Sequence, residues 1–268
     1  MARAADSIGP FVRLAHRPTL EGLENLPASG AYLLVANHSG GIALSELTAL
    51  VWLWRTKAGP GRKLAAMGHP FGFSIWPISS LVRRLGVIPS TRELALATLA
   101  QGIPLLVFPG GDFETSRPIW QANRVQFAGR KGFLRIAREA KVPVVPMGIR
   151  GSAWTAPNLW RSRLLSWLLV LPRLVGVRQY PLTVVGLFGA LVAALLPVHP
   201  AARALLAWAW IGSLFAFLPW IPARIRFRIG PPLHPGELYP GDADDDRQLE
   251  LAYQRVESSV QALVDRKS

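Results

Sequence analysis

Hydrophobic residues are grouped along this chain in short apolar runs that alternate with helical patterns. Continuous apolar runs bounded by glycine or proline are typical of buried strands, and such strands are predicted at 32–37, 63–67, 104–108 and 142–147. Apolar residues at helical spacing predict helices at 46–56, 71–85, 92–101 and 131–140. Strands that alternate with helices at this spacing indicate an α/β domain built on one sheet.

The apolar pattern changes character beyond residue 160. Residues 164–177 are apolar except for Arg173, and the stretches 182–196 and 204–222 contain no charged residue. A helix needs about 20 apolar residues to cross a bilayer, so the first uncharged stretch is short and the second is borderline. We favour an apolar helical hairpin that enters one leaflet of a membrane and returns. Two thin spans and a buried core element are the alternatives.

The last part of the chain returns to a globular pattern. Residues 223–229 alternate between arginine and large apolar residues, which predicts a strand with one apolar and one basic face. The basic face is expected to meet lipid headgroups or a phosphorylated ligand, or else to lie exposed on the sheet; it consists of Arg224, Arg226 and Arg228. An amphipathic helix is predicted at 248–266. We therefore expect a single domain over residues 1–268, with core segments 22–160 and 223–264 and the apolar hairpin within 164–222.

The charge balance narrows the possible partners. Thirty lysines and arginines against 16 acids give a formal net charge of +14, and a protein this basic is drawn to polyanions. Nucleic acid is not expected, because the sequence has no zinc-finger spacing, basic zipper or aromatic RNA-binding signature. Tryptophans lie in aliphatic stretches rather than among the arginines, which is typical of a membrane interface. We expect an anionic membrane surface, or a phosphorylated substrate such as coenzyme A, as partner.

Other kinds of chemistry are excluded by what the sequence lacks. There is no cysteine, and therefore no disulfide, zinc–thiolate site or cysteine nucleophile. No group of histidines and carboxylates has metal-ligand spacing, so neither a metal nor a permanently bound cofactor is expected. The N-terminus lacks a long apolar core followed by a small-residue cleavage site. We therefore expect the protein at the cytoplasmic face of a membrane.

The residues with the clearest chemical potential follow two of the predicted strands. The strand at 32–37 leads into His38, and the strand at 104–108 leads into a glycine loop. Open α/β folds place their sites where strand ends meet loops, and histidine moves protons near neutral pH. The expected site residues on the two loops are Asn37, His38, Ser39, Gly40 and Gly41, and Pro109, Gly110, Gly111 and Asp112. A capping histidine and an ordinary tight turn are the structural alternatives.

Four segments together resemble the glycerolipid (lysophospholipid) acyltransferase superfamily, which includes the bacterial 1-acylglycerol-3-phosphate acyltransferases. They are Val-Ala-Asn-His-Ser-Gly-Gly at 35–41, Gly-Val-Ile-Pro-Ser-Thr-Arg-Glu at 86–93, Val-Phe-Pro-Gly-Gly at 107–111 and Val-Pro-Val-Val-Pro at 142–146. Their order and spacing fit the family, and the resemblance covers roughly residues 22–152. It implies a mixed central sheet flanked by helices.

The resemblance also implies a reaction. A fatty acyl group would pass from acyl-CoA, or from an acyl carrier protein, to a hydroxyl of a lysophospholipid or another glycerolipid. His38 would be the general base of a direct attack, and a carboxylate would hold its second ring nitrogen. The usual aspartate position is occupied by Ala43, and the nearest following acid is Glu46. Glu46 is therefore the expected partner of His38, while an acid in the first turn of a helix also has a purely structural explanation.

The glycine loop and Arg92 are expected to bind phosphate, since a guanidinium forms bidentate hydrogen bonds with a phosphate group. Gly110 stands where many family members have glutamate, and the nearest acids are Asp112 and Glu114. Asp112 is expected to orient the acceptor or to cap a helix. Phe113 stands where a polar or basic residue is usual, and the next cation is Arg117.

These departures from the family pattern leave two alternatives open. The first is an acyltransferase that acts on mono- or diacylglycerol or on another alcohol, which the Ser-Gly-Gly and Gly-Gly variants suggest. The second is a membrane-bound family member that has lost catalysis, which the changed residues at 46, 110 and 113 suggest.

Overall fold

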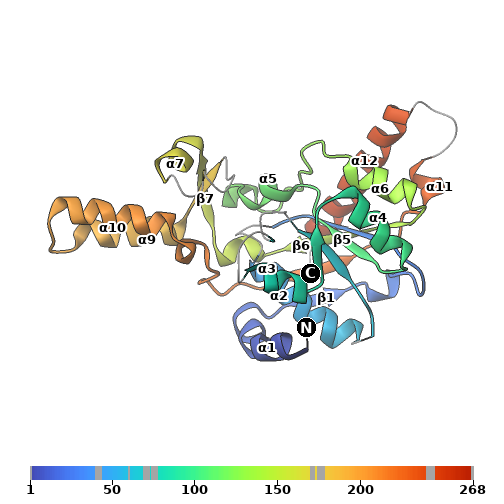
Figure 1. The fold of residues 1–268 in the computed structure, drawn as a ribbon, viewed down its shortest axis with the longest axis horizontal. Coiled ribbons are helices and arrows are strands. Elements are labelled where there is room, and N and C mark those ends of the chain that lie inside the picture. The colour runs from blue at the N-terminus through green and yellow to red at the C-terminus, as the bar shows by residue number, and fades with distance from the viewer. Residues whose placement is uncertain are drawn as a thin grey trace.

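The core of the protein is a mixed seven-stranded sheet (Figure 1). The computed structural model describes residues 2–39, 44–59, 61–68, 73, 78–169, 173, 179–239 and 245–266. The strand order is β1-β9-β6-β2-β5-β3-β4, and every neighbouring pair is parallel except the antiparallel pair β6–β9. The strands are β1 (Thr19–Glu21), β2 (Leu33–Ala36), β3 (Ala65–Gly68), β4 (Val87–Pro89), β5 (Leu105–Val107), β6 (Val144–Arg150) and β9 (Arg226–Ile229).

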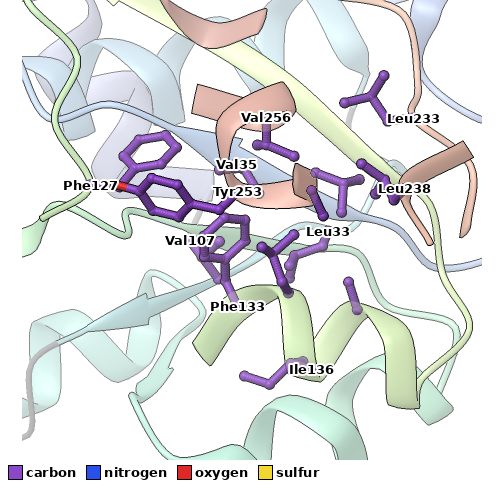
Figure 2. Packing of buried hydrophobic residues seen from close by; sticks show 14 of the residues in the cluster. Leu33, Val35, Val107, Phe127, Phe133, Ile136, Leu233, Leu238, Tyr253 and Val256 are labelled. Atoms are coloured by element: carbon purple, nitrogen blue, oxygen red, sulfur yellow. The ribbon is translucent and has the colours of Figure 1, made fainter. Parts of the chain in front are cut away.

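Helices cover both faces of the sheet. Strand β2 is central and buried on both sides because its residues are all apolar: Leu33 and Val35 belong to one core cluster, and Leu34 and Ala36 to the other. The first cluster packs under α4 (Arg92–Ala100), α6 (Gly132–Glu139) and α12 (Asp245–Asp265). Figure 2 shows its aromatic side chains, with Phe127, Phe133 and Tyr253 gathered over the strands. The second cluster packs under α1 (Ala2–His16) and α2 (Leu44–Leu53).

A helical hairpin extends away from the sheet (Figure 1). It consists of α9 (Val184–Leu195) and α10 (Pro200–Gly212). Its base is a small antiparallel sheet of β7 (Asn158–Ser162) and β8 (Tyr180–Thr183), with α7 (Arg163–Leu168) beside it. Within the hairpin, the indole of Trp210 packs on Gly189. A Cβ on Gly189 would lie 2.0 Å from Nε1 of Trp210, so glycine allows the two helices to pack closely at this point. In the described parts of the chain, no helix combines the length and the apolar character needed to cross a membrane.

The remaining elements are short. They are α3 (Ile78–Arg84), α5 (Gly111–Thr115) and α11 (Pro235–Leu238), a π-helical turn (Trp54–Ala58), and 3₁₀ turns at Leu23–Asn25, Ile119–Gln121, Ser152–Thr155 and Leu214–Phe217. The helix predicted at 71–85 appears as α3 in its last part, while most of its first part lies outside the described residues. The N-terminal segment forms the helix α1, which packs on the second core cluster, and then the edge strand β1.

The prediction for the arginines of the closing strand is wrong for Arg228. This residue is 3% exposed, so it lies neither on a lipid-facing nor on a solvent-facing surface. Its guanidinium pairs with Glu21 of the neighbouring strand β1 (3.3 Å) and donates to the carbonyl oxygens of Leu263 and Arg266 at the end of α12. The positive charge thus stabilises a helix C-terminus. Arg224 is exposed and Arg226 is half-buried.

Candidate active site

The candidate site lies where β2 and β5 end side by side. The two strands pair in parallel, with Val35 opposite Val107, so the residues that follow them meet at one edge of the sheet. The ring of His38 stacks on the ring of Phe108, with centroids 3.9 Å apart and planes inclined by 9°. The structure therefore brings His38 and the start of the glycine loop into direct contact.

His38 is held by Glu46. Its Nδ1 is hydrogen-bonded to Oε1 of Glu46, which reaches it from the first turn of α2. The second ring nitrogen, Nε2, has no hydrogen-bond partner among the described residues, and the side chain is 12% exposed. A carboxylate on Nδ1 fixes the tautomer that leaves Nε2 free to accept a proton. The pair thus has the geometry of a general base and its orienting acid.

The carboxylate of Glu46 is fully buried and has several hydrogen-bond donors. Its Oε2 accepts from the backbone N–H of Ser39 (3.0 Å) and from the hydroxyl of Ser152 (2.7 Å). Ser152 follows β6, the other neighbour of β2, and begins a turn that Thr155 ties to α2 through Ser45 (2.8 Å). A buried carboxylate is stable as an anion when such donors surround it. Glu46 therefore both orients the ring of His38 and lies as an acid in the first turn of α2, so the two explanations of this residue are compatible.

Asn37 joins the histidine loop to β6. Its amide oxygen accepts from the N–H of Ile149 (2.8 Å), and its amide nitrogen donates to the carbonyl of the same residue (2.9 Å). Both ends of the side chain are used inside the protein, so Asn37 positions the loop instead of presenting its amide to a substrate. Ser39 is also buried, and its hydroxyl has no partner among the described residues. Gly40 and Gly41 lie outside the described residues.

The glycine loop is a tight strand-to-helix turn. The N–H of Gly111 donates to the carbonyl of Phe108 (3.1 Å), so this amide closes the turn and is not free for an anion. Gly111 has a φ of +47°, a conformation that favours glycine. Arg130 lies over the loop and donates to the carbonyls of Gly110 (3.1 Å) and Pro109 (3.4 Å). Another nitrogen of its guanidinium pairs with Asp112 (2.7 Å). Asp112 lies within the first turn of α5, whose N-cap residue is Gly110, so the capping position predicted for Asp112 is wrong.

A second buried acid, Glu114, holds the backbone of His38. Its Oε2 accepts from the His38 N–H (2.7 Å), and its Oε1 accepts from the Gln126 N–H (2.9 Å). Arg117 pairs with Oε1 (3.4 Å) and also donates to the His38 carbonyl. Burial raises the pKa of Glu114 to about 7, against the opposing effects of Arg117 and of the hydrogen bonds. Burial likewise lowers the pKa of Arg117, against the attraction of Glu114.

Arg92, the expected phosphate ligand, is paired elsewhere. It begins α4 after the edge strand β4, two strands from β5, and its guanidinium binds Glu139 of α6 (2.5 Å). Both side chains are well exposed. Lys131 pairs with Glu250 of α12 (2.6 Å). Arg117 and Arg130 are the cations that contact the site: Arg117 donates to the His38 carbonyl, and Arg130 to the glycine loop, among the residues that the structure describes.

Sequence reasoning missed the role of several site residues. Glu114 was noticed only as an acid near Gly110, and Ser152 was not noticed at all. The available signal for Ser152 was its position directly after the strand that neighbours β2. Asn158, at the start of β7, was also missed; it donates to the carbonyls of Thr115 (2.8 Å) and Arg117 (3.4 Å) and so ties the base of the hairpin to α5.

One protein-family model matches half of this chain. The family model described as Acyltransferase matches residues 17–150, a region that contains both loops of the site. Among solved structures, the crystal structure of the 1-acyl-sn-glycerophosphate acyltransferase PlsC from Thermotoga maritima aligns with a TM-score of 0.52 and 17% identity. The alignment covers 98% of this chain and 81% of that protein, which indicates a shared fold.

The curated relatives that match this chain are longer proteins, and only part of each one is aligned. An uncharacterised protein of Mycobacterium leprae is 28% identical over 96% of this chain, and the match spans 63% of that protein. The bovine protein named DGAT1/2-independent enzyme synthesizing storage lipids is 29% identical over 57% of this chain and 44% of its own length. The chain thus spans less than two thirds of the length of these relatives.

Proposed function

We propose that this chain, which belongs to the acyltransferase family, catalyses the transfer of a fatty acyl group to a hydroxyl of a lipid. The observation that carries the proposal is the pair of His38 and Glu46. Nε2 of His38, which has no partner in the described part of the chain, lies at the edge of the sheet, beside the glycine loop and inside the segment that matches the family. The sequence has no Gly-x-Ser-x-Gly motif that would supply a serine nucleophile.

The proposed mechanism is a direct attack on a thioester. Nε2 of His38 accepts the hydroxyl proton while the hydroxyl oxygen bonds to the thioester carbonyl carbon. The tetrahedral intermediate then collapses, the carbon–sulfur bond breaks, and the imidazolium returns the proton to the leaving thiolate. Glu46 stabilises the imidazolium through Nδ1. The donor is acyl-CoA or an acyl carrier protein, so the thiol of the carrier is the second product.

Two guanidinium groups are candidates for a phosphate of the donor or acceptor. Arg92 is favoured by the resemblance, and it lies at the carboxyl edge of the parallel strands. Arg130 is favoured by position, because it contacts the glycine loop directly. We assign the phosphate to Arg130, since it contacts the glycine loop, whereas Arg92 follows a strand two places away from β5.

The protein is proposed to act on a membrane surface, held there by the hairpin. Apolar side chains are exposed along both of its helices, including Phe188 (67%), Leu195 (84%) and Leu205 (63%). The sequence between Glu139 and Glu237 contains no acid and ten lysines and arginines, so the whole region is compatible with anionic lipid. Six tryptophans are largely exposed, on the hairpin and near its base: Trp120, Trp154, Trp160, Trp167, Trp208 and Trp220. Tryptophan at this density is typical of a membrane–water interface.

The acceptor is proposed to be a lysophospholipid or another glycerolipid that the protein takes from the membrane. The names of two relatives support different choices within that class, a 1-acyl-sn-glycerophosphate acyltransferase and an enzyme synthesizing storage lipids. A mono- or diacylglycerol acceptor is therefore the second candidate. In both cases the acid–base chemistry at His38 is the same.

Product analysis tests the proposal and separates the two acceptors. The protein is bound to anionic vesicles and given labelled acyl-CoA, or labelled acyl carrier protein, with lysophosphatidate, lysophosphatidylcholine, monoacylglycerol or diacylglycerol. The expected product is a labelled glycerolipid in one acceptor series, together with an equal amount of free thiol. Coenzyme A and vesicle binding without a labelled product from any acceptor would overturn the proposal in favour of a family member that has lost catalysis.

A further inference from the structure

Gly110 lies directly under the side chain of Glu114. A Cβ at position 110 would be 2.2 Å from Cγ of Glu114 and 2.4 Å from its Cδ and Oε2. The backbone of Gly110 has a φ of −66° and a ψ of −28°, which any residue adopts without strain. Glycine is therefore required at this position by the path of the Glu114 side chain and not by the backbone conformation.

We propose that Glu114 is a positioning residue for His38, and that it reaches the histidine only because Gly110 has no side chain. The proposal rests on the proposed function, in which His38 is the general base. Gly110 and Glu114 then form one functional unit, although only the second residue contacts His38.

The contacts of Glu114 explain how it positions the base. Its Oε2 accepts from the N–H of His38 (2.7 Å), and Arg117, which it pairs with, donates to the carbonyl of the same residue. The backbone of His38 is thus held on one side by Glu114 of α5 and on the other by Arg117, which follows that helix. Glu114 is fully buried and Arg117 is 3% exposed, so water does not compete for these bonds.

Two carboxylates therefore divide the task of placing the imidazole. Glu46 holds the ring through Nδ1, and Glu114 holds the backbone from which the ring extends. A base displaced by even about 1 Å loses much of its effect, because proton transfer requires hydrogen-bond distance in the reacting complex. Loss of Glu114 should therefore lower kcat, while substrate binding, which depends on other groups, changes little.

A double-mutant cycle tests the coupling between the two residues. Glu114→Ala is expected to lower kcat about tenfold, with KM changed less than about twofold, because a hydrogen bond to the base is lost. Gly110→Ala is expected to lower kcat by a similar factor, because the new Cβ displaces Glu114. The double variant should be no worse than Glu114→Ala alone, since the clash is gone once the long side chain is removed. Effects on kcat that simply multiply would overturn the proposal.

Two further variants separate positioning from general stability. Glu114→Gln keeps the shape and one acceptor, so its kcat should lie between those of the wild type and Glu114→Ala. Glu257→Gln is the matched control, because Glu257 also accepts a loop N–H, that of Phe127 (2.8 Å), but has no contact with His38. It should lower stability and leave kcat within about twofold. A kcat loss in Glu257→Gln as large as that in Glu114→Gln would also overturn the proposal.

A readout without turnover distinguishes this proposal from the proposed function. The backbone amide proton of His38, which donates to a carboxylate, should resonate far downfield in NMR spectra and should move upfield in both Glu114→Ala and Gly110→Ala. This shift is expected whether or not the protein transfers acyl groups. An unchanged amide resonance in either variant would contradict the placement of Glu114, even if the wild type proves to be an acyltransferase.

Discussion

The region around His38 buries charged side chains, whereas the α9–α10 hairpin exposes apolar side chains. Glu46 and Glu114 are fully buried, and Arg117 is nearly so, yet each has hydrogen-bond partners inside the protein. The apolar side chains of the hairpin, such as Phe188 and Leu195, have no comparable cover within the described chain. The first region satisfies its polar groups internally and so fixes a geometry. The second leaves apolar side chains exposed, which is why we propose that it binds an external partner.

The difference predicts how each region responds to substitution. Changes near His38 should act on the rate of the chemical step, because the network positions a reacting group. Changes on the hairpin should act on membrane binding and leave the chemistry intact. Asn158, which bonds to α5 from the base of the hairpin, is one point where the two regions meet.

The largest effect is expected from Glu46→Gln. The amide keeps the shape of the side chain but no longer stabilises the imidazolium, so kcat should fall about 10³-fold. Initial rates of acyl transfer at saturating donor measure this, with vesicle binding unchanged as the control. A loss of less than about tenfold would show that Glu46 is only a helix-start acid.

The next largest effect is expected from Leu191→Glu combined with Leu195→Glu on α9. The change removes two exposed apolar side chains, 56% and 84% exposed, and adds charge that anionic lipid repels. The loss should be about 3 kcal/mol, or roughly 100-fold in vesicle affinity, as measured by flotation or sedimentation with liposomes. The matched control is Leu251→Glu on α12, which is 51% exposed but lies outside the hairpin. Equal losses in both proteins would contradict membrane docking by the hairpin.

A smaller effect is expected on the pH dependence of stability in Glu114→Gln. The pKa of Glu114 is raised by burial from 4.5 to about 7, so the folded state binds this proton more tightly than the unfolded state. The wild type should therefore lose stability relative to the variant as pH rises from about 4.5 to about 7, by on the order of 1 to 3 kcal/mol. Urea unfolding of both proteins at pH 5 and pH 8 measures the difference. Parallel stability profiles would contradict the burial of an ionisable group at this position.

The smallest effect is expected at Arg92. Its guanidinium pairs with Glu139, and the residue follows a strand two places away from β5, so Arg92→Ala should change KM for a phosphorylated acceptor by less than about twofold. Arg130→Ala, at the glycine loop, should raise the same KM several-fold and leave KM for an uncharged acceptor unchanged. The opposite order would restore Arg92 as the phosphate ligand.

The central part of the fold could be predicted from the sequence because its signal is local. The runs around β2, β5 and β6 are continuously apolar, as expected for strands buried on both faces. The strands β1, β7 and β8 have three to five residues with mixed polarity, and β4 has only three residues. The pairing of β1 also depends on a partner, β9, at the other end of the chain. The burial of Arg228 was missed for the same reason, since its partner Glu21 is 207 residues away.

The site could be predicted in part. The sequence identifies His38 and names Glu46 as the acid to pair with it, and the structure brings the two side chains together. The role of Glu114 could not be derived, because it depends on one short helix folding its carboxylate back over Gly110. Hydrophobic periodicity and motif spacing do not reveal such a close approach. The folded structure does, because it shows that a Cβ on Gly110 would overlap the Glu114 side chain.

The most direct test of the account is acyl transfer by wild type and His38→Ala, compared on the acceptor that gives most product, with equal amounts of each protein bound to vesicles. The account predicts that labelled lipid forms with the wild type and falls by at least about 100-fold in the variant, while coenzyme A binding persists. Equal product formation by the two proteins would contradict the assignment of His38 as the base and, with it, the proposed mechanism.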